Sequence, residues 1–424
     1  MIDFINPTRK NWSKISKRPE LDLEKIKPLV EKVFKDVKKY GDKSLLKYSK
    51  EFDKTIIKSI KVKRKDLLNS KNKVSEKLKC AIKSAKKNIE KFHEAQKVVF
   101  KKIETEKGVE CWQEKKAIEK VGLYIPGGTA PLFSTILMLA IPAKIAGCKE
   151  IILCTPPDKK GKVPKELLFT ADLCGISKIY CVGGAQAIAA MTFGTETIPK
   201  VYKIFGPGNQ YVTMAKQYSL NYNVSIDMPA GPSELLVVGD STSNATFIAS
   251  DLLSQAEHGI DSQVILVSTS KDLIKSVKKQ ILIQVKLLTR KDIAKESLKN
   301  SKFIYFESNK DASDFINEYA PEHYIISIEN EDYFISKIMN AGSVFVGKYS
   351  PESAGDYASG TNHTLPTNGY SKQYSGVNLD SFTKTITFQK ITKSGLSKLS
   401  ETIQLMAQAE NLDGHKKAVS IRFK

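Results

Sequence analysis

Histidine and cysteine are both scarce in this chain, with five histidines and six cysteines among 424 residues. No two cysteines form a Cys-x-x-Cys pair, and four of them lie in apolar surroundings. The pattern argues against a disulfide framework and predicts reduced, buried thiols in a cytoplasmic protein. The cysteines are Cys80, Cys111, Cys148, Cys154, Cys174 and Cys181.

Long apolar runs are also absent. The first residues, "MIDFINPTRKNW", lack the apolar core of a signal peptide. The longest apolar run, "ILMLAIPA" from Ile136, is too short to span a bilayer and contains Pro142. We therefore expect no membrane segment, and we predict a buried helix at this run.

Acidic residues are too few to balance the basic ones, and the formal net charge is +21. A nucleic-acid partner would explain the excess, but such proteins usually concentrate arginine, lysine and aromatic residues on one face. Here the excess is nearly all lysine, spread at helical spacing through stretches such as "KPLVEKVFKDVKKYGDKSLLKYSK". The pattern favours solvated helix faces, and we expect no nucleic-acid partner.

The chain is long enough for two or three domains, and two kinds of pattern divide it. Residues 1 to about 115 and the tail after 380 have helical spacing, whereas short apolar runs alternate with helical stretches between 118 and 346. This alternation predicts an α/β fold with mainly parallel sheets. The nine predicted strands form two sets, each able to make one doubly wound sheet, with one continuous sheet as the alternative. The strands are expected within 120–126, 150–156, 178–184 and 200–206, then within 234–240, 263–269, 303–308, 323–328 and 343–347.

Glycine-rich loops follow three strands of the first set, in "YIPGGTAPLFST", "VGGAQAI" and "FGPGNQYV". Glycine lets the backbone approach a ligand, and helix N-termini favour anionic groups such as a pyrophosphate. The G-x-G-x-x-G and P-loop fingerprints are missing. Tight turns without a ligand therefore explain these loops about equally well.

Four of the five histidines have a carboxylate or amide close by in the sequence. "SQAEHG" places Gln255 and His258 on one face of a helix expected to end at Gly259. His93, alone in a lysine-rich helix, is predicted to be structural or on the surface. The other pairs are Glu322 with His323 in "APEHY", Asp356 with His363 in "ESAGDYASGTNH", and Glu410 with His415 in "AENLDGHKK".

These donors are imidazole nitrogens and amide or carboxylate oxygens, without thiolate. The set suits catalytic Zn²⁺ or another borderline ion such as Mn²⁺. The residues by themselves predict a metal site, an acid/base pair and glycine loops on an α/β scaffold. A zinc hydrolase and a dehydrogenase both remain open at this point.

Several long stretches together resemble one family. "GLYIPGGTAPLFSTILMLAIPAKIAG", "DMPAGPSELLVV", "SQAEHG", "APEHY", "ESAGDYASGTNHTLPT" and "LDGHKKAVSIR" resemble the histidinol dehydrogenases in order and spacing, from about residue 20 to the end. The resemblance implies a zinc-dependent enzyme that oxidises L-histidinol to L-histidine through L-histidinal, reducing two NAD⁺.

The resemblance also implies roles for individual residues. The metal ligands would be Gln255, His258, Asp356 and His415, which also contact the substrate. The acid/base pair would be Glu322 and His323, with His323 taking the hydroxyl proton and Glu322 activating the water needed for the second oxidation. Further substrate contacts would be Ser233, His363 and Glu410, and the NAD contacts would be Tyr124, Gln186 and Asn209.

The architecture that the resemblance implies is an intertwined homodimer of two incomplete Rossmann-like domains. One domain would be discontinuous, comprising 23–123 and 234–377, and the other would be 124–233. An N-terminal arm, 1–22, and a C-terminal helical segment, 378–424, would cross between subunits, so that Glu410 and His415 reach the partner's site. The sequence departs from the family pattern at Tyr324, where leucine is expected, and in its lysine excess.

Overall fold

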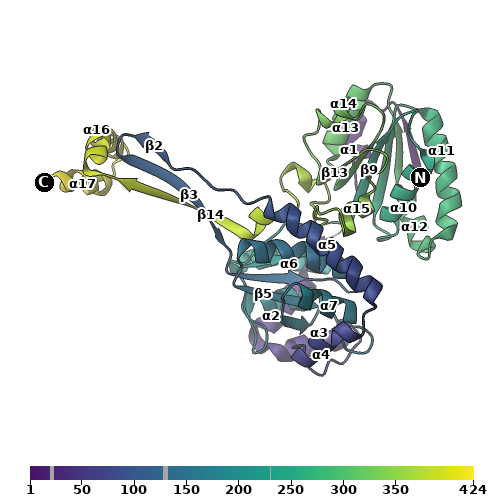
Figure 1. The fold of residues 1–424 in the computed structure, drawn as a ribbon, viewed down its shortest axis with the longest axis horizontal. Coiled ribbons are helices and arrows are strands. Elements are labelled where there is room, and N and C mark those ends of the chain that lie inside the picture. Colours follow the sequence, from purple (N-terminus) through teal and green to yellow (C-terminus); the bar gives the residue numbers. More distant parts are fainter. Residues whose placement is uncertain (20–22, 128–131, 230) are drawn as a thin grey trace.

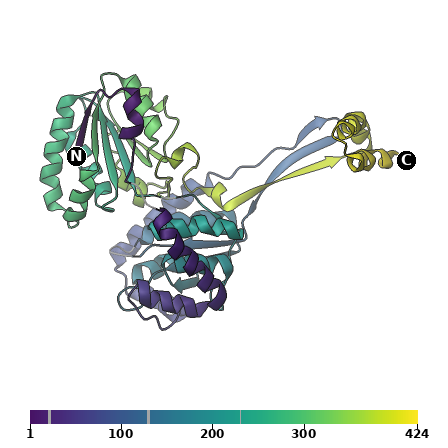
Figure 2. The same ribbon diagram turned by 180° about the vertical axis from the view of Figure 1, so that it is seen from behind.

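The computed structural model describes residues 1–19, 23–127, 132–229 and 231–424. These residues form two α/β units and a long ribbon that projects from them, as Figures 1 and 2 show from opposite sides. The glycine loop expected after residue 124 falls partly on 128–131, outside the described residues.

The first unit is built on a parallel sheet of six strands within the described residues. Its order is β1-β11-β10-β9-β12-β13, so the chain crosses from one side of β9 to the other before β12. β9 and β10 are buried along their whole length, which explains their unbroken apolar runs. The strands are β1 (Ile2–Ile5), β9 (Glu234–Gly239), β10 (Gln263–Ser268), β11 (Lys302–Tyr305), β12 (His323–Ser327) and β13 (Ser343–Val346).

Helices cover both faces of this sheet. Side chains alternate along each strand, so Leu235 and Val237 pack with one helix layer while Leu236 and Val238 pack with the other. The first layer contains α10 (Ala245–Ala256), α11 (Lys271–Gln284) and α12 (Lys291–Lys299); the second contains α1 (Arg9–Ile15), α13 (Asn309–Tyr319) and α14 (Glu331–Ile335). The expected N-terminal arm is therefore wrong for residues 2–15, because β1 pairs with β11 and α1 buries Trp12 and Ile15 against this sheet.

The second unit contains a parallel sheet of five strands in the described part of the chain. Its order is β6-β5-β4-β7-β8, so the crossover point lies between β4 and β7. Ligands in such sheets bind outside the carboxyl ends of the strands at the crossover. The strands are β4 (Lys120–Tyr124), β5 (Glu150–Thr155), β6 (Lys178–Cys181), β7 (Lys203–Phe205) and β8 (Ser225–Ile226).

The N-terminal helices pack on this five-stranded sheet. One core joins Val30, Phe34 and Ile89 with strand residues Val121 and Ile204. The expectation that 23–123 fold together with 234–377 is therefore wrong for these helices, whose apolar stripes match the helices of the second unit: α2 packs on α8 and α9, and α5 packs on α6. The helices are α2 (Leu23–Tyr40), α3 (Asp42–Phe52), α4 (Arg64–Asn69), α5 (Glu76–Glu94), α6 (Phe133–Ala146), α7 (Lys165–Leu173), α8 (Gly184–Phe193) and α9 (Gln210–Ser219).

Helix α6 is the buried helix predicted from the apolar run, and residues 134–143 are all buried. Pro142 lies inside it and has no N–H to donate to Met138, four residues earlier. The amide of Asn362 donates to that carbonyl instead, at 2.6 Å. The carbonyl that Pro142 leaves without a helical donor thus forms a hydrogen bond between the second unit and the segment after α15 (Glu352–Tyr357).

The projecting ribbon is an antiparallel sheet in the order β14-β3-β2. It carries α16 (Lys393–Ala409) and α17 (Asp413–Ser420) at its far end, with the C-terminus beyond them (Figures 1 and 2). The helical patterns expected up to residue 115 and after residue 380 are wrong for 103–106, 109–115 and 383–391. The strands are β2 (Ile103–Glu106), β3 (Val109–Ala117) and β14 (Thr383–Ile391).

Short 3-10 helices complete the described structure at Ser70–Asn72, Leu220–Tyr222, Val285–Leu287, Tyr370–Lys372, Leu379–Phe382 and Ile421–Phe423. Cys148, Cys154, Cys174 and Cys181 are buried, which confirms the prediction of four buried thiols. No helix in the described ranges is both long and apolar enough to cross a membrane.

Candidate functional site

The predicted acid/base pair lies at the start of β12, in the middle of the six-stranded sheet. Helix α13 ends at Tyr319, and Ala320 turns the chain with a φ of +54°. Pro321 follows, and Glu322 and His323 then enter the sheet with only 5% and 4% of their surfaces exposed. The site is therefore at the amino ends of these strands, although ligands in parallel sheets more often bind at the carboxyl ends.

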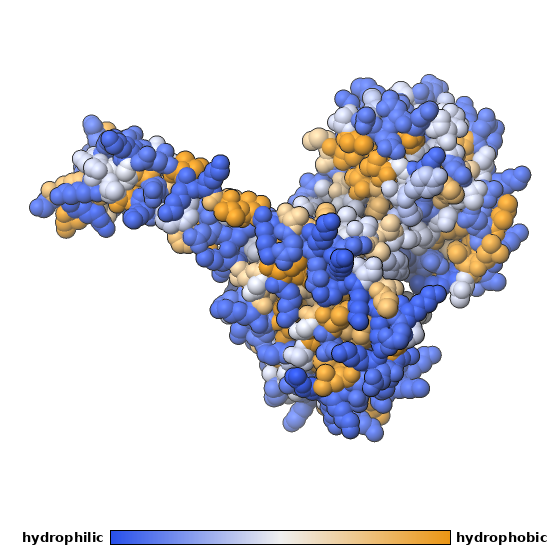
Figure 3. Space-filling view, viewed as in Figure 1, coloured by the Kyte–Doolittle hydropathy of each residue, from blue (hydrophilic) through white to orange (hydrophobic). Residues whose placement is uncertain are grey.

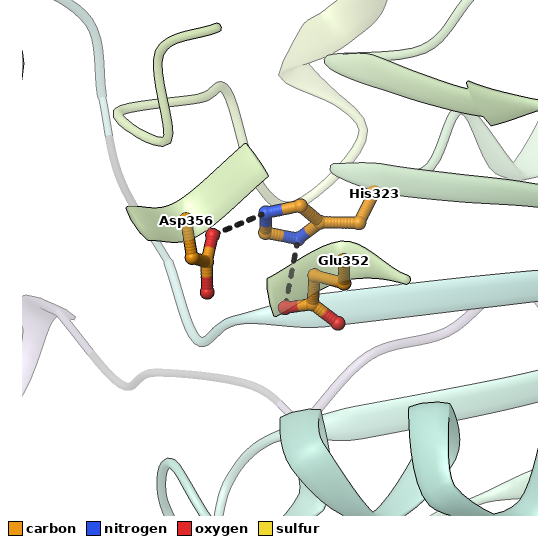
Figure 4. Close-up of side chains that lie close together, drawn as sticks. All are labelled: His323, Glu352 and Asp356. Carbon is orange, nitrogen blue, oxygen red and sulfur yellow. Dashed lines mark ion pairs between the residues drawn. The ribbon is translucent and has the colours of Figure 1, made fainter. Parts of the chain in front are cut away.

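One hydrogen bond fixes the tautomer of His323. Its Nδ1 lies 3.0 Å from the carbonyl oxygen of Glu234, which accepts only, so Nδ1 carries the proton. Nε2 is buried and has no hydrogen-bond partner among the described residues. Figure 4 shows the ring between two carboxylates, with Nε2 3.8 Å from Oδ1 of Asp356. The free nitrogen is therefore the basic one.

The backbone of Glu234 also binds the neighbouring carboxylate. Its N–H donates to Oε2 of Glu322 at 2.8 Å. Burial raises the pKa of Glu322 well above its usual value, and burial lowers the pKa of His323 while the Asp356 carboxylate opposes that change. The raised pKa makes the Glu322 carboxylate a stronger base, and the lowered pKa favours the neutral form of the His323 ring.

Helix α15 supplies two carboxylates one turn apart, Glu352 and Asp356 (Figure 4). Oε1 of Glu352 lies 3.7 Å from Nδ1 of His323, and neither of its oxygens is hydrogen-bonded. The ligating atoms of His323, Glu352 and Asp356 all lie within 4.8 Å of one another. Sequence reasoning missed Glu352, although its spacing of four residues from Asp356 places both on one helix face.

The last turn of α10 brings Gln255 to the same region. Gln255 is fully buried, and neither its amide nitrogen nor its amide oxygen has a partner. The helix ends at Ala256 and not at Gly259 as expected, because Glu257 caps it in an ordinary helical conformation. His258 therefore lies just beyond the helix, exposed to solvent, where Asp356 acts on it electrostatically.

His363 connects this site to the second unit. Its Nδ1 is 2.9 Å from the backbone oxygen of Asp356, and its Nε2 is 3.2 Å from Oγ1 of Thr135 in α6. Thr135 follows the glycine loop of β4, so the carboxyl edge of the five-stranded sheet faces the predicted acid/base pair. Ser233 is next to Glu234 in the chain and is partly buried.

The three predicted NAD contacts all lie at that carboxyl edge. Tyr124 ends β4, and its hydroxyl accepts from the N–H of Gly184 at 3.1 Å. Gln186 in α8 is fully buried with both amide atoms unpaired. Asn209 caps α9 by accepting from the N–H groups of Tyr211 and Val212, each at 3.1 Å. The end of β4 and the N-terminal turns of α8 and α9 thus lie at one edge of the sheet.

Two predicted residues are not in this site within the single chain. Glu410 ends α16 and His415 lies in α17, at the tip of the projecting ribbon. Figures 1 and 2 both place that tip well away from β12 and α15. His93, in contrast, is fully buried with Nδ1 3.0 Å from the carbonyl of Ile89, which confirms a structural role.

Comparison with known proteins identifies what the chain is similar to. The family model described as histidinol dehydrogenase matches residues 16–423. A histidinol dehydrogenase of Bacteroides fragilis is 57% identical over 419 residues, covering 98% of this chain and 97% of the relative. One of Bacteroides thetaiotaomicron is 54% identical over 417 residues, with the same coverage.

A solved structure agrees with the sequence comparison. The crystal structure of histidinol dehydrogenase from Elizabethkingia anophelis superposes with a TM-score of 0.97 at 54% identity, covering 100% of this chain and 98% of that one.

Proposed function

The chain belongs to the histidinol dehydrogenase family, and from this premise we propose that it oxidises L-histidinol to L-histidine in two NAD-dependent steps at the site around His323. The single observation that carries the proposal is the His323 ring, with Nδ1 held by Glu234 and the buried Nε2 left free. An alcohol oxidation needs such a base, and general-base catalysis contributes roughly 10²–10⁴-fold.

In the first step, Nε2 of His323 takes the proton of the substrate hydroxyl group. A hydride then leaves the carbinol carbon for the nicotinamide ring, giving L-histidinal, NADH and a proton. Because burial lowers the pKa of His323, its ring is neutral and ready to accept a proton at neutral pH.

In the second step, a water molecule adds to the aldehyde, and the resulting diol loses another hydride to a second NAD⁺. Glu322 is the group we assign to activating that water, since burial raises the pKa of its carboxyl group and so makes the carboxylate a stronger base. His323 would then act as the base in both oxidations, and Glu322 would act in the hydration between them.

The residues fit a bound metal ion. Gln255, His258 and Asp356 of one chain and His415 of the partner subunit would hold it, and the buried, unpaired amide of Gln255 supports this assignment. Amide, imidazole and carboxylate donors suit Zn²⁺ in an open catalytic site, and we propose one ion per subunit. When bound, the ion would orient the substrate by binding the substrate's imidazole and amino groups.

The other substrate and cofactor contacts follow the same geometry. We assign Ser233, His363 and Glu410 of the partner subunit to the substrate. Tyr124, Gln186 and Asn209 are assigned to NAD, supported by the unpaired amide of Gln186 and by the N-terminus of α9. Each sheet would then be the core of an incomplete Rossmann-like domain, since both reverse their strand order at a central crossover.

We further propose that the active form is a homodimer in which the ribbons cross. The ribbon and its tip expose apolar side chains that a partner subunit would cover, and Figure 3 shows apolar surface along this projection. They include Ile103, Ile386, Leu405, Met406, Leu412, Ile421 and Phe423. The four buried thiols lead us to place the enzyme in the cytoplasm.

A zinc hydrolase would use similar glutamate and histidine residues. It has no need of the buried, unpaired amide of Gln186 at the carboxyl edge of a second sheet. Family membership and this unpaired amide together favour the dehydrogenase.

The test is a rate assay of purified, zinc-loaded protein that follows NADH absorbance. We expect NADH formation to require both L-histidinol and NAD⁺, to stop after chelator treatment and to return with Zn²⁺. Absence of NADH from the zinc-loaded protein would contradict the proposal.

A further inference from the structure

A single residue, Glu234, holds both members of the acid/base pair through its backbone. Its N–H donates to Glu322 at 2.8 Å, and its carbonyl accepts from His323 at 3.0 Å. The position of this one peptide segment therefore sets where both side chains point. The side chain of Glu234 is 1% exposed, so a buried carboxylate lies directly beside the pair.

Arg18, from the N-terminal segment, pairs with that carboxylate. Its Nε donates to Oε1 at 2.8 Å and its Nη2 donates to Oε2 at 2.9 Å, which is the bidentate geometry of an arginine–carboxylate pair. The Arg18 side chain is only 11% exposed. The N–H of Asn368 donates to the same Oε1 at 2.6 Å.

The guanidinium group of Arg18 also binds the end of α13, which leads into Glu322 and His323. Nη2 donates to the carbonyl of Tyr319 at 2.6 Å, and the group stacks 3.9 Å from the centre of the Tyr319 ring. The next residue, Ala320, makes the left-handed turn before Glu322. One side chain thus joins the start of β9 to the start of β12.

We propose that Arg18 and Glu234 are positioning residues for the oxidation, which rests on the proposed function. Arg18 neutralises Glu234 and holds the two strand starts in register, and Glu234 then fixes the tautomer of His323 and the orientation of Glu322. Arg18 lies more than 300 residues from His323 in the sequence, and none of its hydrogen bonds within the described residues goes to His323 or Glu322.

Removing Arg18 leaves the Glu234 carboxylate buried with one remaining hydrogen bond. A buried charge without its partner draws in water or shifts the backbone, and displacing a catalytic group by about 1 Å can lower the rate roughly 10²-fold. The residues assigned to NAD lie in the other unit, so NAD⁺ binding should not change.

The experiment compares full-length, zinc-loaded wild type with Arg18→Met and Arg18→Lys. We expect kcat to fall about 10²-fold in Arg18→Met while KM for NAD⁺ stays at the wild-type value. Arg18→Lys keeps the charge but loses the planar fork, so its kcat should also fall. If Arg18→Met does not fold, Arg18→Lys decides the question by the same two constants.

Arg9→Met is the matched control. Arg9 comes from the same N-terminal segment and pairs with a carboxylate, Asp314, but the two side chains are 61% and 35% exposed and touch neither strand start. Its kcat should equal that of the wild type. A wild-type kcat in the folded Arg18 variants, or a loss in Arg9→Met as large as theirs, would overturn the inference.

A measurement independent of turnover separates this inference from the proposed function. If the wild type makes no NADH, the function fails, and the ¹⁵N NMR signals of the His323 ring then test the inference. We expect a single tautomer with Nδ1 protonated in the wild type and a mixture in Arg18→Met. An unchanged single tautomer in Arg18→Met would contradict a positioning role.

Discussion

The two residues of the acid/base pair are adjacent in sequence but are placed in different surroundings. Nδ1 of His323 donates to the carbonyl of Glu234 and its Nε2 has no partner among the described residues, whereas Oε2 of Glu322 accepts from the N–H of Glu234. The separate roles proposed for His323 and Glu322 depend on this difference in their hydrogen bonds.

Changing Glu322 to glutamine tests these separate roles. We expect Glu322→Gln to slow the oxidation of L-histidinal more than the oxidation of L-histidinol, because only the aldehyde must first gain water. The comparison uses single-turnover NADH formation from each substrate. His323→Asn, the control, should slow both oxidations by about 10²–10⁴-fold. Equal losses from both substrates in Glu322→Gln would rule out separate roles.

The sequence could predict most residues of the proposed site, because histidine is scarce and each motif histidine has a polar neighbour. It missed Glu234 and Glu352, since a single glutamate within an apolar strand motif or a short helix gives no signal of its own. Their roles depend on contacts across the fold, such as the 3.7 Å approach of Glu352 to His323.

At the scale of the elements, all nine predicted strands are confirmed, and they form two sheets and not one. These strands could be predicted because each contains a continuous apolar run. β3 and β14 were missed because most of their side chains are polar, with those of β3 mostly half-buried and those of β14 mostly exposed, which leaves no clear alternation. The sequence could not predict which sheet α2 and α5 pack on, because an apolar stripe shows that a helix face is buried but does not identify the sheet that covers it.

The loop between β7 and α9 depends on a buried ion pair. Lys216 pairs with Asp227 and donates to the carbonyl of Gly206 at 2.8 Å, while Asp227 accepts from the N–H of Gly206 at 2.7 Å. Gly206 has a φ of +125°, and a Cβ there would lie 2.0 Å from the carbonyl oxygen of Tyr124. The strands β4 and β7 therefore meet where only glycine fits.

Removing one member of the Lys216–Asp227 pair should destabilise the folded state. We expect Lys216→Met to lower the free energy of unfolding by about 3–5 kcal/mol, because the Asp227 charge is left buried alone. Urea denaturation followed by circular dichroism measures the loss. The double variant Lys216→Met with Asp227→Asn should lose less than Lys216→Met alone. A loss in Lys216→Met no larger than the loss in Lys279→Met, at an exposed position, would contradict a structural role for the pair.

A buried lysine predicts a pH dependence of stability. Lys302 is 6% exposed and donates to the carbonyl of Lys17, and burial lowers its pKa to about 8. Unfolded lysine titrates near pKa 10.4, so between about pH 8 and 10 the unfolded chain binds more protons and the folded state gains stability as pH rises.

The comparison of wild type with Lys302→Met isolates this gain. The stability of the wild type relative to the variant should be larger at pH 10 than at pH 7.5, as measured by urea unfolding at both values. Lys299→Met, at an exposed position nearby in the sequence, should show no such difference. A relative stability independent of pH would mean that Lys302 is not titrating at a lowered pKa.

At the scale of the whole molecule, the ribbon carries Glu410 and His415 away from the rest of the proposed site. A dimer with crossed ribbons would bring each tip to the other subunit. The sequence alone could not reveal this, because one chain gives no sign of which residues lie in a partner.

Mixed dimers test the shared site. We expect His258→Ala and His415→Ala, each inactive alone, to recover about a quarter of the wild-type activity when coexpressed, because half the dimers are mixed and each has one intact site. His258→Ala with Gln255→Ala is the control; it should recover nothing, since both ligands come from one chain. No recovery in the first mixture would contradict a site shared between subunits.

The central claim is a four-electron oxidation at one site. The most direct measurement is the end-point yield of NADH from a limiting, known amount of L-histidinol with excess NAD⁺. The account predicts two NADH for each histidinol and no aldehyde left in solution. One NADH for each histidinol, with free L-histidinal accumulating, would contradict it.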